Sequence, residues 1–100
     1  MRALLLAIAV LSVAAGAAQA QTVRLSDRNY IALSRCAGLA EGSSVDAASV
    51  QSQLRSQRQG RGDHVRSQAT EARQSAIAEI RAATGTDAER LSAERNVCLA

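Results

Sequence analysis

The two cysteines of this chain, Cys36 and Cys98, constrain its fold more than any other pair of residues. A disulfide requires the two Cα atoms to lie within about 7 Å of each other. These cysteines would close a loop of about 60 residues, and the intervening chain must reverse direction to bring them together. The position of that reversal is therefore the main question that the sequence poses about the fold.

The first 20 residues predict the compartment in which the cysteines reside. A basic residue is followed by an apolar segment and by a small-x-small site, Ala18-Gln19-Ala20. This order is typical of a secretory signal peptide, and the apolar run is shorter than the roughly 20 residues that cross a bilayer. We expect cleavage before Gln21, one domain over residues 21–100 and no membrane span after cleavage. A periplasmic or secreted protein results, in a compartment where disulfides persist.

Large apolar side chains are scarce in residues 21–100, whereas alanine is abundant. The chain has no Pro, Phe or Trp, and its β-branched residues do not cluster. Alanine has the highest helix propensity and lets helix axes approach closely. We therefore predict an all-α domain with a thin core, for which a disulfide would provide support.

Apolar spacing and capping residues divide the domain into four predicted helices, at residues 27–41, 44–59, 63–83 and 87–99. Ser43 is the predicted cap of the second helix. Thr86 and Glu89 form a capping-box pattern at the start of the last. The third helix carries a narrow ridge of small and apolar residues: Val65, Ala69, Ala72, Ala76, Ile80 and Ala83.

The segment 59–63 decides between two architectures. Either Gly60 ends one helix and Asp63 caps the next, which gives an antiparallel four-helix bundle, or one long helix spans 44–83 between two short ones. The long helix would accept two glycines at roughly 1 kcal/mol each. It would also separate the levels of the two cysteines by roughly 33 Å, and they would remain unpaired within the chain.

A chain reversal at 60–62 instead places Cys36 and Cys98 at the same height, so the bundle and the Cys36–Cys98 disulfide are predicted together. Their wide sequence separation lacks the C-x-x-C spacing of redox-active thiols. We interpret the pair as a structural bond.

A local excess of basic residues surrounds the predicted turn: Arg55, Arg58, Arg61 and Arg66. Such a cluster can bind the phosphates of lipopolysaccharide, nucleic acid or an anionic membrane. The alternative interpretation is a solvated basic end of the bundle. No aromatic residues alternate with these arginines for base stacking, so we expect no specific nucleic-acid partner. The formal net charge of +3 falls to +2 once the signal peptide with Arg2 is removed. This charge is too small to indicate a polyanionic partner by itself.

Catalytic, cofactor-binding and metal-binding residues are not expected from the sequence. His64 is the single histidine, and neither a three-ligand metal set nor a nucleophilic triad accompanies it. Arg61-Gly62-Asp63 spells a cell-adhesion tripeptide, but a three-residue match arises readily by chance.

The sequence therefore predicts a small exported, non-enzymatic helical protein. Our first hypothesis is a periplasmic interaction or structural module that offers an alanine-rich groove or apolar patch to an unidentified protein partner. The alternative is a protein that binds an anion or an anionic envelope surface through the arginines between Arg55 and Arg66.

Overall fold

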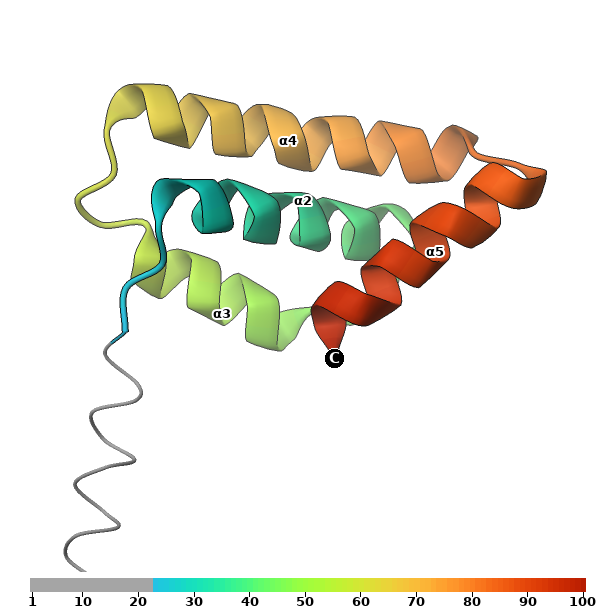
Figure 1. Ribbon diagram of the computed structural model, residues 1–100, viewed down its shortest axis with the longest axis horizontal. Coiled ribbons are helices and arrows are strands. Elements are labelled where there is room, and N and C mark those ends of the chain that lie inside the picture. Colours follow the sequence, from blue (N-terminus) through green and yellow to red (C-terminus); the bar gives the residue numbers. More distant parts are fainter. Residues whose placement is uncertain (1–22) are drawn as a thin grey trace, which may run out of the picture.

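The computed structural model describes residues 23–100, which form an all-α bundle (Figure 1). Its helices are α2 (Asp27–Gly42), α3 (Ala48–Gln57), α4 (Asp63–Ala82) and α5 (Gly85–Leu99), and these residues contain no strand. The prediction of an all-α, antiparallel four-helix bundle is thereby confirmed. The predicted signal peptide, residues 1–20, lies outside the described residues.

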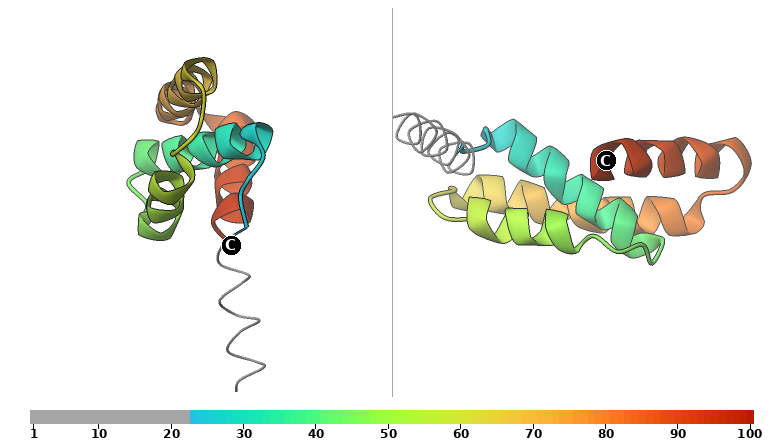
Figure 2. Two further views of the ribbon diagram at one scale, coloured as in Figure 1. Left: turned by 90° about the vertical axis from the view of Figure 1, so that its left-hand side faces the viewer. Right: turned by 90° about the horizontal axis from the view of Figure 1, so that it is seen from below.

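Helix α2 is the centre of the bundle. It contacts each of the other three helices and packs most extensively against α4. Successive helices run in opposite directions, so α2 and α4 are parallel (Figure 1). Figure 2 shows α3 and α5 on opposite sides of α2.

The chain reverses between α3 and α4, as the bundle architecture requires. Gly60 adopts a φ of +78°, a left-handed conformation that glycine tolerates and most side chains do not. Gly62 is the extended N-cap residue of α4, and Asp63 is the first helical residue instead of the predicted cap. The alternative of a single helix over 44–83 is therefore wrong.

The same reversal brings the cysteines together. Cys36 of α2 is bonded to Cys98 of α5, and their Cα atoms are 6.0 Å apart. The predicted disulfide is confirmed, and it joins the first and last helices of the described chain.

Helix α3 begins four residues later than predicted. The Ser43 hydroxyl donates to the Leu39 carbonyl (2.6 Å) instead of capping a new helix. Ser44 has a φ of +56°, and the Val45 amide returns to the Ala40 carbonyl (2.9 Å). Helical geometry resumes only where Asp46 Oδ1 accepts a hydrogen bond from the Ala48 amide (3.1 Å). The prediction that Ser43 caps α3 is therefore wrong.

Helix α5 begins two residues earlier than predicted. Gly85 is its first residue and has a φ of +58°. Thr84 occupies the N-cap position with extended backbone, and its side chain makes no capping hydrogen bond. The predicted start at 87, with Thr86 and Glu89 as a capping box, is wrong because Gly85 allows the chain to turn earlier.

Two small apolar clusters form the core. One contains Cys36, Ala37, Ala40, Ala47 and Val50, between α2 and α3. The other contains Leu39, Ala76 and Leu91, where α2, α4 and α5 meet. Alanines supply much of both clusters, so the core is as thin as the composition predicts.

A stripe of small residues on α2 lets α4 approach closely. Ser34, Gly38 and Gly42 recur every fourth residue and are therefore on one face. A Cβ atom at Gly38 would lie 2.9 Å from the Ala76 Cβ and nearer still to the Arg73 carbonyl. At Gly42, a Cβ would lie 3.0 Å from the Ile77 carbonyl oxygen. Close approach of the two backbones thus depends on residues without side chains.

Candidate anion-binding groove

Arg61, one of the four predicted anion-binding residues, is buried inside the bundle. Only 6% of the residue is exposed, and its guanidinium lies 4.7 Å from the centroid of the Tyr30 ring. Arg61 Nη1 donates to Asp27 Oδ1 (2.7 Å), and Nη2 donates to the Leu25 carbonyl (2.7 Å). Its Nε donates to the Gln57 carbonyl (2.9 Å). These bonds commit Arg61 to the structure of the turn.

Arg61 belongs to a clamp that holds the segment before α2 against the α3–α4 turn. The Gln57 side chain donates to the Val23 carbonyl (3.1 Å) and accepts from the Leu25 amide (3.0 Å). Arg24 Nη2 donates to the Gln59 carbonyl (2.6 Å). The burial of Arg61 also prevents Arg61-Gly62-Asp63 from being displayed as an adhesion tripeptide.

The other three predicted arginines surround a groove of about 220 Å³. Helix α2 forms its floor, and α3 and α4 form its walls. It is lined by Tyr30, Ser34, Gln51, Leu54, Arg55, Arg58, Arg66, Ala69, Thr70 and Arg73. The groove therefore brings together basic residues from both sides of the turn.

Four guanidinium groups line this groove, and two of them have carboxylate partners. Arg66 pairs with Asp63, whose side chain is 94% exposed. Arg73 Nε pairs with Glu41 Oε2 at 2.5 Å. Within residues 23–100, no carboxylate lies within ion-pair distance of Arg55 or Arg58. The groove thus carries an excess of two positive charges over its paired carboxylates.

The Glu41–Arg73 pair fixes one wall of the groove at neutral pH. The hydrogen bond from Arg73 holds the pKa of the Glu41 carboxyl below its usual range. The same bond raises the pKa of the Arg73 guanidinium. Both groups are therefore charged, and the remaining nitrogens of Arg73 keep their capacity to donate to a ligand.

Apolar groups from three helices form the middle of the groove. Leu54 of α3 and Ala69 of α4 flank Tyr30 of α2. Tyr30 is 6% exposed, and its hydroxyl donates to no group within residues 23–100. Every side-chain nitrogen or oxygen in these residues that is fully buried has a hydrogen-bond partner, so the Tyr30 hydroxyl is not fully buried. The hydroxyl therefore keeps access to solvent and can donate to a group in the groove.

Arg73 is the groove residue that the sequence interpretation missed. It lies seven residues after Arg66, two turns along the same face of α4. That spacing is visible in the sequence, but the third predicted helix is defined by its ridge of small residues, which does not contain Arg73. Arg61, conversely, is among the predicted residues because it is close in sequence to the other three arginines.

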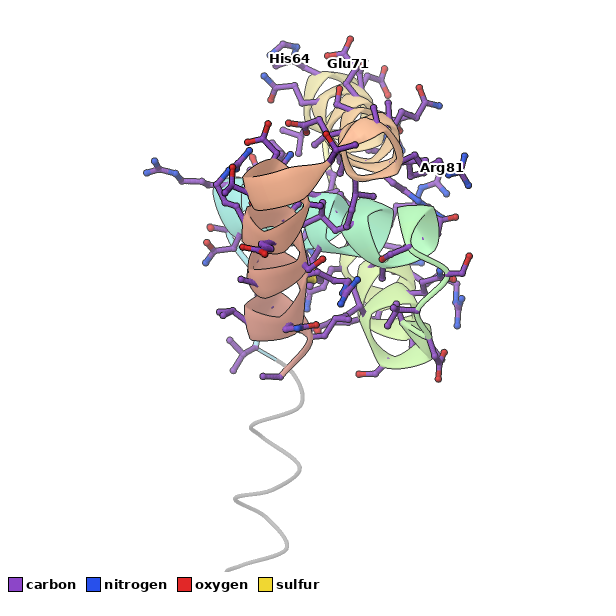
Figure 3. All side chains as sticks on the ribbon, turned by 90° about the vertical axis from the view of Figure 1, so that its right-hand side faces the viewer. His64, Glu71 and Arg81 are labelled. Atoms are coloured by element: carbon purple, nitrogen blue, oxygen red, sulfur yellow. A yellow bond between two sulfur atoms is a disulfide. The ribbon has the colours of Figure 1, made fainter. Side chains whose placement is uncertain are left out.

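The side chains that could take part in catalysis or bind a metal do not gather at one place in the described residues. His64 and Glu71 project from α4 away from the other helices (Figure 3). Across residues 23–100, no three His, Cys, Asp or Glu side chains are grouped so that they could hold a metal ion. In the same span, no helix combines the length and the apolar character needed to cross a membrane.

Comparisons with known proteins identify no relative. No protein-family model, no curated protein and no solved structure matches this chain.

Proposed function

We propose that this protein is a small exported, non-enzymatic binding module that holds an anionic partner in the groove between α3 and α4. The observation that carries the proposal is the convergence of four arginines on one hollow of about 220 Å³. Arg55 and Arg58 have no carboxylate partner within the described chain. Guanidinium groups bind carboxylates and phosphates through paired hydrogen bonds.

The alanine-rich ridge of α4 favours this proposal over a docking surface made of alanines. Ala69 is 4% exposed and Ala76 is fully buried. The ridge packs against α2, so these alanines form core and are not accessible to a protein partner. The groove is the accessible surface on which side chains from three helices converge.

Export is the part of the proposal that rests on the sequence and on the disulfide. The first 20 residues have the order of a signal peptide. The Cys36–Cys98 bond persists in an oxidising compartment such as the periplasm or the extracellular medium. An anion-binding module in that compartment can meet solutes, envelope surfaces or acidic partner proteins.

Calorimetric titration of the oxidised protein with inorganic pyrophosphate tests the binding function. We expect binding that weakens as salt is raised, because the groove opens to solvent and its charges are screened. The double variant R55Q/R58Q is expected to bind at least about tenfold more weakly, since the loss of one charge-assisted hydrogen bond already corresponds to about a factor of ten.

The variant R81Q/R90Q is the matched control, since it removes the same charge outside the groove. Arg81 projects from the far end of α4 (Figure 3), and Arg90 is on α5. We expect this control to bind pyrophosphate like the unmodified protein. Equal weakening in both double variants, or absence of pyrophosphate binding, would overturn the proposed function.

A further inference from the structure

We infer that the groove recognises a phosphate monoester attached to a compact organic body. This inference rests on the proposed anion-binding function and specifies the ligand class. It follows from three properties of the groove: its volume, its excess charge and the apolar groups between its arginines.

The volume restricts the ligand to a small group. Sites for drug-sized ligands have volumes of about 300–1,000 Å³, whereas this groove has a volume of about 220 Å³. A partner helix, about 10 Å wide with its side chains, is too bulky to enter a groove of this volume. A phosphate with a single ring or a short polyol does.

The charge favours a dianion over a monoanion. Arg55 is in the last turn of α3, and Arg58, three residues later, is the C-cap residue with helical backbone angles, so the two extend from the same face. They face Arg66 and Arg73 of α4 across the groove. A phosphate monoester carries about −1.5 to −2 charges at pH 7 and has three strong acceptor oxygens. It can therefore accept hydrogen bonds from both walls at once, whereas a carboxylate carries a single charge on only two oxygens.

The floor favours an organic ester over free phosphate. Leu54 presents apolar surface between the two arginine walls, and the small exposed parts of Tyr30 and Ala69 lie in the same lining. Free phosphate is solvated on all sides and gains nothing from these groups. A ring or chain attached to the phosphate can cover them, while the Tyr30 hydroxyl donates to an oxygen of that body.

Glucose 6-phosphate and glucose 6-sulfate are the soluble probes that test this inference, because they differ in charge but little in shape. We expect the phosphate ester to bind about tenfold more tightly than the sulfate ester, which corresponds to one additional charge-assisted hydrogen bond. R55Q/R58Q should abolish this preference, and R81Q/R90Q should retain it. Far-UV circular dichroism and mass spectrometry confirm that each variant is helical and disulfide-bonded.

Vesicles distinguish a lipid headgroup from a soluble ester. Phosphatidic acid carries a phosphate monoester, whereas phosphatidylglycerol carries a singly charged diester. Co-sedimentation with phosphatidic acid vesicles but not with phosphatidylglycerol vesicles, lost in R55Q/R58Q, assigns the monoester to a lipid. Preference for glucose 6-phosphate without vesicle binding assigns it to a soluble ester.

Two results separate the failure of this inference from the failure of the proposed function. The two glucose esters could bind with equal affinity, the two vesicle types could bind equally, and R55Q/R58Q could weaken all of this binding. That result overturns the monoester inference and leaves a general anion site. Binding of pyrophosphate alone, with neither ester nor vesicle bound, likewise overturns it. Absence of all binding, pyrophosphate included, overturns both.

Discussion

Gly38 of α2 and Ala76 of α4 meet so closely that a methyl group at position 38 would lie 2.9 Å from the Ala76 Cβ. The Arg73 carbonyl is nearer still to that position. Ala76 itself is fully buried. The parallel pair α2 and α4, which supports the floor and one wall of the arginine groove, therefore depends on the absence of a side chain at Gly38.

The substitution Gly38→Ala is expected to destabilise the protein by about 2–3 kcal/mol, the upper part of the range of about 1–3 kcal/mol that is typical of overpacking. The gain in helix propensity from alanine, about 1 kcal/mol, offsets only part of the clash because the nearest atom belongs to the α4 backbone. Urea denaturation followed by circular dichroism measures the change. Because α4 is displaced, we also expect pyrophosphate binding to weaken.

Gly62→Ala is the matched control. Gly62 has a φ of −67°, which alanine adopts readily, and a Cβ there would meet no atom within 4 Å. A small change, about 0.5 kcal/mol, is expected at this N-cap position. If Gly38→Ala and Gly62→Ala had the same effect on the free energy of unfolding, close packing at Gly38 would not be limiting.

Arg61→Met is expected to lower the free energy of unfolding by about 2 kcal/mol and to release the segment before α2. Methionine keeps part of the apolar stem against Tyr30, but it leaves the Leu25 and Gln57 carbonyls without their donor. The loss is smaller than for a fully buried ion pair because Asp27 is 62% exposed. Hydrogen exchange of the Leu25 amide reports the release of this segment.

Arg58→Met provides the comparison for Arg61→Met, since Arg58 is exposed and has no carboxylate partner within residues 23–100. We expect it to leave both the free energy of unfolding and exchange at Leu25 unchanged, while weakening anion binding. Conversely, unchanged exchange at Leu25 in Arg61→Met would contradict the role of Arg61 in the clamp.

The disulfide and the chain reversal could be predicted together from the sequence, because the bond cannot form without the reversal. A continuous helix through Gly60 and Gly62 would keep Cys36 far from Cys98, so the expectation of a disulfide across a thin core favours the turn. Helix positions also followed from apolar spacing. Helix ends were less predictable because Ser43 and Thr86 each had a plausible cap pattern that tertiary contacts or a nearby glycine overrode.

The burial of Arg61 could not be predicted from its neighbours in sequence. Its partners at Leu25 and Asp27 precede it by more than 30 residues, and only the folded bundle places them beside the turn. The role of Gly38 could not be predicted either, because the need for a small residue inside a helix depends on which helix packs against it. Arg73 is in α4, and the contact of α4 with Gly38 determines how that helix, and with it Arg73, faces the groove.

Reduction of the Cys36–Cys98 disulfide is expected to lower the free energy of unfolding by about 4 kcal/mol, the chain-entropy estimate for a loop of this length. The bond joins residues separated by 62 positions. Without it, α5 is held mainly by Leu91 in the core and by the Arg35–Glu94 pair. Thermal unfolding with and without reductant measures the effect, and Cys36→Ala/Cys98→Ala serves as a reductant-insensitive control. A reduced protein as stable as the oxidised one would show that packing alone holds α5.

Acidification is expected to weaken the contacts of α2 with α4 and α5, because carboxylates at both contacts have lowered pKa values. Arg35 donates to Glu94 through Nε at 2.6 Å and Nη2 at 3.2 Å, and also to Glu79 at 2.7 Å. The hydrogen bond from Arg35 lowers the pKa of Glu94, and that from Arg73 lowers the pKa of Glu41. A carboxyl group with a lowered pKa in the folded state contributes stability above its unfolded pKa of about 4.3 and loses it as pH falls through the folded value.

The free energy of unfolding should therefore decline as pH falls below about 4.3, and E41Q/E94Q should show a shallower decline. Added salt should reduce the difference between this variant and the unmodified protein, because all four side chains of the two ion pairs are partly exposed. Glu71→Gln is the control, since Glu71 projects from α4 into solvent (Figure 3), and its pH dependence should match the unmodified protein. Urea denaturation across the acid range measures the slopes. The same slope in E41Q/E94Q and in the unmodified protein would show that protonation of these two carboxylates does not govern acid unfolding.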